Sequence, residues 1–70
     1  MGTGRRLQSA RAAMNLSQRK LGARVGISAE AICRYERDQR EPDRETTILL
    51  ARALNVSPSW LAGFDVEVEG

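Results

Sequence analysis

Seventy residues make one small domain, near the lower size limit for folding without a disulfide or a metal. The sequence has no histidine and a single cysteine, Cys33, which excludes an internal disulfide and argues against a zinc site and against an enzyme. The net charge is +2, but residues 1–29 carry six basic and no acidic side chains, which favours a polyanionic partner.

The first predicted helix runs from about Arg5 to Met14. Leu7, Ala10 and Met14 share one stripe of this helix, and Arg11 lies at the edge of the stripe. We expect the stripe to enter a small aliphatic core, because only three residues of the chain are aromatic.

Residues 17–36 predict two short helices hinged at a glycine. Ser17 can cap the first helix, Gly26 can end it in the left-handed conformation, and Ser28 can cap the second helix two residues later. Each of these signals is common alone, but their close spacing indicates a helix-turn-helix unit of the kind that binds DNA.

The second helix of this unit, residues 28–37, has two different faces. Ile32 and Tyr35 fall on an inward arc with Ala31 and Glu36, whereas Ala29, Glu30, Cys33, Arg34 and Arg37 fall on the outward arc. A major groove admits such a helix, and an arginine can fork onto guanine O6 and N7. The alternative is that Glu30 and Arg34 form only a surface ion pair, and both interpretations can hold together.

Two further helices are predicted after the loop. Asp43 can cap a helix whose buried stripe is Thr47, Leu50, Ala51 and Leu54, with Asn55 as its left-handed end. Ser57 and Pro58 then begin a short fifth helix that continues to Gly63.

The acidic tail, residues 65–70, alternates apolar and acidic side chains. This pattern suits a strand paired with a partner chain, a frayed terminus or the beginning of a linker.

Many residues of the chain follow one family's pattern: Arg11, Leu16-Ser17-Gln18, Leu21, Val25-Gly26-Ile27-Ser28, Ile32, Tyr35-Glu36, Pro42, Leu50-Ala51, Leu54-Asn55-Val56-Ser57 and Trp60-Leu61. Through them, residues 5–64 resemble the Cro and phage-repressor type of helix-turn-helix domain, the xenobiotic-response-element-like group. The resemblance implies an all-α, five-helix lambda-repressor-like bundle. Gly22 and Asp38 depart from the family, which usually has alanine and glycine there, and Gly22 should loosen its helix by up to about 1 kcal/mol.

The resemblance also implies a function. We expect a sequence-specific double-stranded DNA-binding transcriptional regulator, a repressor, in which the positions matching Ala29, Glu30 and Arg34 read bases. The expected phosphate contacts are Ser17, Gln18, Ser28, Arg37, Arg40 and Arg44. The family commonly pairs the positions of Arg11 and Glu36, which predicts a partly buried ion pair.

A homodimer on a palindromic operator is expected, because one recognition helix contacts too few base pairs to define a unique site. The predicted dimer surface is Trp60, Leu61 and Phe64, which gather more apolar area than so short a helix can bury. So small an interface is compatible with a free monomer that dimerises only on its operator.

Other functions stay open at this point. The chain could be a protein-interaction module of the same fold, such as an antitoxin or coactivator, with Ile48 and Leu49 as its surface, or the DNA-binding part of a longer repressor. No apolar run has membrane-spanning length and no signal peptide is recognisable, so we expect a cytoplasmic protein that binds no membrane and no cofactor. The operator, the regulated genes and any inducer cannot be inferred from the sequence.

Overall fold

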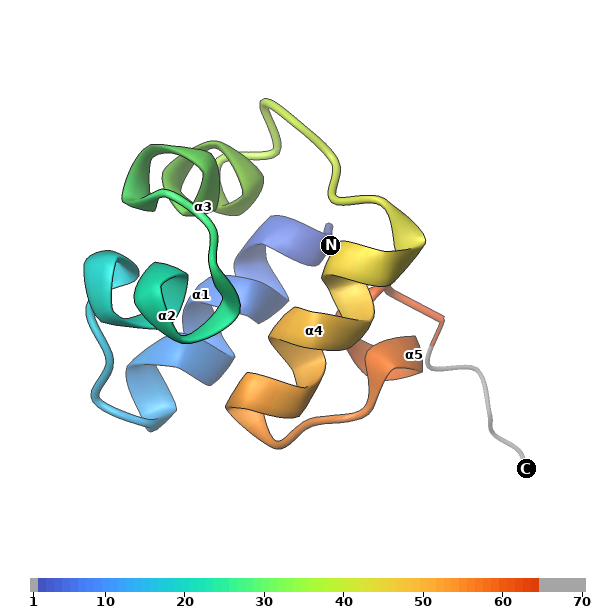
Figure 1. The fold of residues 1–70 in the computed structure, drawn as a ribbon. Helices are drawn as coiled ribbons and strands as arrows, with labels where there is room; N and C mark the ends of the chain where they lie inside the picture. Colours follow the sequence, from blue (N-terminus) through green and yellow to red (C-terminus); the bar gives the residue numbers. More distant parts are fainter. Residues whose placement is uncertain (1, 65–70) are drawn as a thin grey trace.

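The computed structural model describes residues 2–64, which fold into five helices (Figure 1). They are α1 (Thr3–Ala13), α2 (Gln18–Val25), α3 (Ala29–Glu36), α4 (Arg44–Leu54) and α5 (Pro58–Leu61). All regular secondary structure in this range is helical, so the predicted all-α fold is confirmed. The acidic tail and its possible strand lie outside the described residues.

Local side chains start four of the five helices. Ser17, Ser28, Asp43 and Ser57 each occupy the N-cap, and each side-chain oxygen accepts a hydrogen bond from the backbone N–H three residues later. The donor–acceptor distances run from 2.8 Å at Asp43 to 3.3 Å at Ser57. These bonds satisfy N–H groups that have no partner inside the helix, and all four predicted caps are confirmed.

The first helix differs from its predicted limits. It begins at Thr3 and ends at Ala13, and Met14 is 40% exposed instead of lying in the core. The chain turns sharply after Ala13, because Asn15 adopts a left-handed φ of 57°, and Leu16 enters the core instead. Leu16 precedes the Ser17 cap, where an apolar residue commonly packs against the first turns of the following helix.

The core lies where all five helices meet. Its largest fully buried side chains are Leu7, Leu21, Ile32, Leu50 and Leu61, and one of them comes from each helix. α1 contacts both α3 and α5, α2 packs on α3 and α4, and α4 packs on α5 (Figure 1). The core therefore holds the inner face of α3 and leaves the opposite face outside.

The fourth helix agrees with its prediction. Thr47, Leu50, Ala51 and Leu54 are all buried, and Asn55 ends the helix with a left-handed φ of 59°. The hydroxyl of Thr47 donates to the carbonyl of Asp43 at 2.9 Å, which satisfies the one polar side chain of this stripe. None of the helices within residues 2–64 combines the length and the apolar character needed to cross a membrane.

Candidate nucleic-acid interface

The helix-turn-helix unit occupies the side of the molecule where α2 packs against α3 (Figure 1). The turn between the two helices begins at Gly26, whose φ of 74° is left-handed. The N–H groups of Gly26 and Ile27 both donate to the carbonyl of Gly22, and these bonds close α2 before Ser28 starts α3. The predicted glycine hinge is therefore confirmed.

Gly22 has a structural role that the sequence did not reveal. A Cβ atom on this residue would lie 2.2 Å from the carbonyl oxygen of Ile27, in the turn. A backbone carbonyl cannot rotate out of the way as a flexible side chain can, so alanine would push the turn away from α2. Gly22 lowers the intrinsic stability of α2, but its missing side chain lets the turn at Ile27 pass close to this helix.

The outward face of α3 carries the residues predicted to read bases. The side chains of Glu30 and Arg34 are 75% and 52% exposed, and Arg34 Nη2 lies 2.9 Å from Glu30 Oε2. Ala29 is half-buried at the start of the helix. The contact between Arg34 and Glu30 is the surface ion pair of the alternative interpretation. A guanidinium has five N–H donors, however, so Arg34 can bind another acceptor while it contacts Glu30. Base reading therefore stays a prediction.

On the other side of the same helix, Glu36 is the centre of a polar network. Arg11 Nε lies 2.6 Å from Glu36 Oε2, and Arg11 Nη2 lies 3.1 Å from Glu36 Oε1. Arg11 Nη1 also donates to the carbonyl of Leu16, and Gln18 Nε2 donates to Glu36 Oε1 at 3.0 Å. The two charged side chains are 15% and 4% exposed, and the predicted ion pair is present. The hydrogen bond to Glu36 raises the pKa of Arg11 above its ordinary value.

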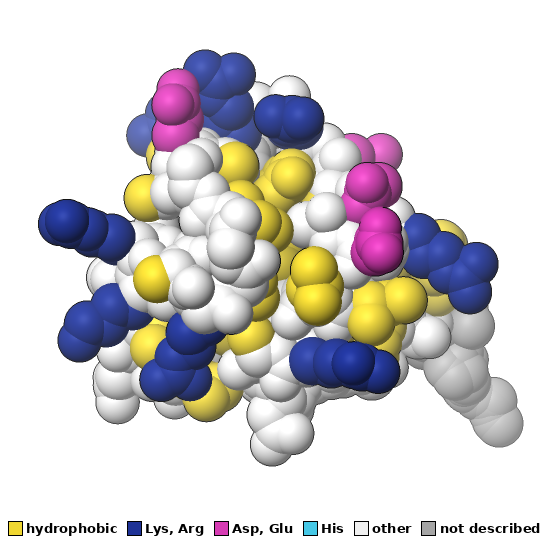
Figure 2. Space-filling model, viewed as in Figure 1, with side chains coloured by type: hydrophobic (Ala, Val, Ile, Leu, Met, Phe, Trp, Pro, Cys, Tyr) yellow, Lys and Arg dark blue, Asp and Glu magenta, His cyan; other side chains and the backbone are white. Residues whose placement is uncertain are grey.

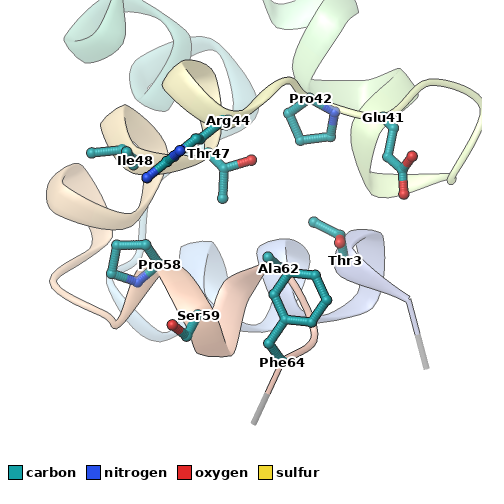
Figure 3. Close-up of a pocket in the computed structure, with 10 residues that line it drawn as sticks. All are labelled: Thr3, Glu41, Pro42, Arg44, Thr47, Ile48, Pro58, Ser59, Ala62 and Phe64. Carbon is teal, nitrogen blue, oxygen red and sulfur yellow. The ribbon is translucent and has the colours of Figure 1, made fainter.

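The predicted phosphate contacts lie in different parts of the surface. Ser17 and Gln18 stand at the start of α2, and Ser28 stands at the start of α3. Arg40, which follows α3, shares a hollow in the surface with Ser28 and Arg34. Arg44, at the start of α4, lines a different pocket beside α5 (Figure 3). Their contact with phosphate stays a prediction.

The C-terminal apolar surface is smaller than the sequence suggested. Leu61 is fully buried in the core of the single chain, so its assignment to a dimer surface is wrong. Trp60 is half-buried, and the guanidinium of Arg6 lies over its ring at 5.3 Å. Phe64 is 69% exposed and lies at a pocket that Thr3, α4 and α5 also line (Figure 3). The side chain of Leu61 points into the core because α5 buries one face against α1 and α4.

Charge is unevenly distributed over the face that Figure 2 shows. Basic side chains project along the side formed by α2 and α3, with others beside α4, and acidic side chains gather near the start of α4 (Figure 2). Within residues 2–64, no three histidine, cysteine, aspartate or glutamate side chains are grouped so that they could hold a metal ion. The half-buried Cys33 is a free thiol.

Asp38 makes a contact that the sequence did not predict. Its carboxylate Oδ1 accepts a hydrogen bond of 3.1 Å from the backbone N–H of Gly4, which lies 34 positions earlier in the chain. The available signal was weak: an aspartate stood where the family commonly has glycine. A contact over such a sequence separation cannot be inferred from local spacing.

Comparison with known proteins agrees with this geometry. The profile of a family described as Helix-turn-helix matches residues 7–61. The HTH-type transcriptional regulator ImmR of Bacillus subtilis (strain 168) is 35% identical over 65 residues, which are 93% of this chain and 51% of ImmR. Repressor protein C2 of Salmonella phage P22 is 36% identical over 63 residues, which are 90% of this chain and 29% of the repressor. The chain thus spans about half, or less, of the length of these two relatives.

Two solved structures share the fold. One is the crystal structure of the P22 c2 repressor protein in complex with the synthetic operator 9T in the presence of Tl+, with a TM-score of 0.87 and 35% identity over 93% of this chain and 98% of that chain. The other is the solution structure of the DNA-binding domain of the P22 c2 repressor, with a TM-score of 0.84 and 33% identity over 99% of this chain and 92% of that chain.

Proposed function

This chain belongs to the helix-turn-helix family, and from that premise we propose that it is a sequence-specific, double-stranded DNA-binding transcriptional regulator that acts as a repressor. The observation that carries the proposal is the outward face of α3. Glu30 and Arg34 are exposed there, in a fold that closely matches a repressor in complex with a synthetic operator.

In this proposal, α3 docks in the major groove, which is about 12 Å wide and admits a helix. Ala29 has a small side chain near the start of α3, so the helix can approach the bases closely. Arg34 donates to guanine O6 and N7, and Glu30 orients Arg34 or accepts a hydrogen bond from cytosine N4.

Phosphate contacts fix the position of the helix on the duplex. Backbone N–H groups at the start of α2, beside Ser17 and Gln18, face one phosphate, and Ser28 contributes at the start of α3. Arg37 at the end of α3, Arg40 in the following loop and Arg44 at the start of α4 supply further positive charge. The bound protein blocks or adjusts the access of RNA polymerase, which is how a repressor acts.

The functional species in this proposal is a two-fold dimer on a palindromic operator. Two copies would place their recognition helices about 34 Å apart, one turn of DNA. With Leu61 in the core, the interface centres on the exposed Phe64 and the uncovered part of Trp60. An interface of this size is weak, so the free chain is monomeric and dimerises on DNA.

The proposal also assigns binding, without catalysis, to a protein that works in the cytoplasm. The chain lacks histidine, and its single cysteine is half-buried on the outward arc of α3. Nucleophilic catalysis by a thiol needs an adjacent base, and the sequence offers no histidine for that role.

Selection of bound duplexes from a random double-stranded DNA library tests the proposal. The selected sequences should share two inverted half-sites whose centres are about 10 base pairs apart. Binding of the winning duplex, measured by fluorescence anisotropy against a scrambled duplex of equal composition, should weaken as salt rises on both duplexes while the preference remains. Failure to enrich any sequence would contradict the proposal and favour a protein-interaction module.

A further inference from the structure

The start of α1 lacks a cap from its own neighbourhood. The first N–H groups of a helix have no partner within it, and a side chain at the N-cap commonly supplies one. At α1 the N-cap is Gly2, which has no side chain and makes no such bond. The carboxylate of Asp38 takes this role from a distant part of the chain, because it accepts the hydrogen bond of Gly4 N–H.

The same Asp38 ends the recognition helix. Its N–H donates to the carbonyl of Tyr35, and the N–H of Gln39 donates to the carbonyl of Arg34. These two bonds form the Schellman arrangement, in which the residue at this position is left-handed and usually glycine. Asp38 adopts a φ of 58°, which is unfavourable for a residue with a Cβ atom. Its side chain therefore supplies something that glycine could not.

The two helix ends approach each other closely. A Cβ atom on Gly4 would lie 2.4 Å from the carbonyl oxygen of Glu36 and 2.6 Å from that of Tyr35. Only glycine lets the first turn of α1 lie against the last turn of α3. The carboxylate of Asp38 lies in this contact, where it faces the positive end of α1.

α1 is thus attached to the end of α3 at two levels. Near the C-terminal end of α1, Arg11 forms an ion pair with Glu36. Near the N-terminal end of α1, the N–H of Gly4 donates a hydrogen bond to Asp38. Two attachments restrict the rotation of α3 about its own axis more than one attachment can. The loop that carries Arg40 leaves α3 directly after the second attachment.

We propose that Asp38 is a positioning residue for DNA recognition: by capping α1 from the end of α3, its carboxylate fixes the orientation of the recognition helix and of the loop that carries Arg40. The proposal rests on the proposed function, because the surface that is positioned is the one that reads DNA. Asp38 itself contacts α1 and need not touch DNA.

A matched pair of variants, Asp38→Gly and Asp38→Asn, separates the side-chain cap from the other properties of the residue. Both remove the same charge, and both tolerate a left-handed backbone, but only asparagine keeps an oxygen that can accept from Gly4 N–H. Glycine is the preferred residue at this position of a Schellman motif, so the glycine variant is expected to fold.

Amide hydrogen exchange measured by NMR tests the attachment without DNA. The amide of Gly4 should exchange about tenfold faster in Asp38→Gly than in Asp38→Asn, since one hydrogen bond at the helix start is lost. The amide of Leu50 in α4 should exchange equally in the two variants. Equal exchange of the Gly4 amide in both would overturn the proposal.

Binding to the selected duplex and to a scrambled duplex tests the positioning. Affinity for the selected duplex should be about threefold to tenfold lower for Asp38→Gly than for Asp38→Asn. The loss on the scrambled duplex should be smaller, because only the phosphate contact of the Arg40 loop is affected there. Unequal exchange with equal selected-site affinity would overturn the positioning role and leave a cap that only supports the fold. A wild-type chain without any sequence preference would instead refute the proposed function, whatever the exchange data show about Asp38.

Discussion

Arg11 and Glu36 form a bidentate ion pair between α1 and the last residue of α3, with Nε to Oε2 at 2.6 Å and Nη2 to Oε1 at 3.1 Å. The pair is almost fully covered, and the Leu16 carbonyl and the Gln18 amide satisfy further polar atoms of the two groups. A buried pair of this kind gains little over apolar side chains of equal size, but the removal of one partner leaves an uncompensated buried charge.

Glu36→Gln should therefore lower the free energy of unfolding by about 3 kcal/mol or more. Glu30→Gln is the matched control, because it makes the same change in the exposed pair with Arg34 and should cost less than about 0.5 kcal/mol. Urea unfolding followed by circular dichroism measures both values. Equal losses in the two variants would show that Arg11 and Glu36 are solvated in solution.

Acid sensitivity should appear at the start of α4. The backbone N–H of Thr46 donates to the Asp43 carboxylate at 2.8 Å, and this hydrogen bond lowers the pKa of Asp43 below its ordinary value. A carboxyl group with a lowered folded-state pKa adds stability above its unfolded pKa of about 3.9, and that stability is lost as the pH falls through the folded-state pKa. The stability difference between the wild type and Asp43→Asn should thus decrease between about pH 5 and pH 2. A difference that is constant over this range would contradict the assignment.

Gly22 provides a test in which helix propensity and packing predict opposite results. Propensity alone predicts that Gly22→Ala stabilises α2 by up to about 1 kcal/mol. The contact with the Ile27 carbonyl predicts instead a loss of about 1–3 kcal/mol, because the turn must move. Ala23→Gly, at the exposed neighbouring position, is the control and should lose about 1 kcal/mol from propensity alone. A higher melting temperature for Gly22→Ala would refute the packing explanation.

The two apolar residues at the C-terminal end should respond differently to truncation. Leu61→Ala should cost about 2–5 kcal/mol of stability, because the side chain is fully buried. Phe64→Ala should change stability by less than about 0.5 kcal/mol, since the ring is exposed. If Phe64 also forms the dimer contact, its variant should bind a full palindrome more weakly and an isolated half-site equally well. A large stability loss for Phe64→Ala would show that the ring packs into the domain.

The starts of α2, α3, α4 and α5 were predictable because local chemistry determines them, whereas α1 begins at Thr3 without a local cap and α5 ends at Leu61, before the predicted Gly63. A cap such as Ser28 accepts a hydrogen bond from the backbone N–H three residues later. A left-handed residue such as Asn55 ends its helix through hydrogen bonds within one turn. The stripe of α4 was equally local, because one helical period separates its members. These signals are complete within a few residues of sequence, and the structure agrees with them.

The remaining features depend on tertiary contacts. Met14 and Leu16 both suited the core by residue type, and the turn at Asn15 decided between them. Leu61 was assigned to the surface because the short fifth helix seemed unable to bury all its apolar area, but α1, α4 and α5 meet there. The bond from Gly4 to Asp38 joins residues 34 positions apart, and no periodicity could indicate it.

Arg40 provides the comparison for the test of base reading. It lies beside Arg34 in the same surface hollow, and both are arginines, so truncation removes the same charge from each position. If Arg40 contacts only phosphate, Arg40→Ala should weaken binding to selected and scrambled duplexes equally. The slope of log affinity against log salt should then decrease by about one unit on each duplex.

The most direct test of whether α3 reads sequence is the affinity of Arg34→Ala for DNA. It is measured on the selected duplex and on a scrambled duplex at one salt concentration and compared with that of the wild type. The variant should lose about 1–3 kcal/mol on the selected duplex and much less on the scrambled one, because a forked contact to a guanine is lost. Replacement of that guanine by 7-deazaguanine, which lacks the N7 acceptor, should weaken the wild type and leave the variant unchanged. Equal losses on both duplexes would show that Arg34 contacts only phosphate and would contradict base reading by α3.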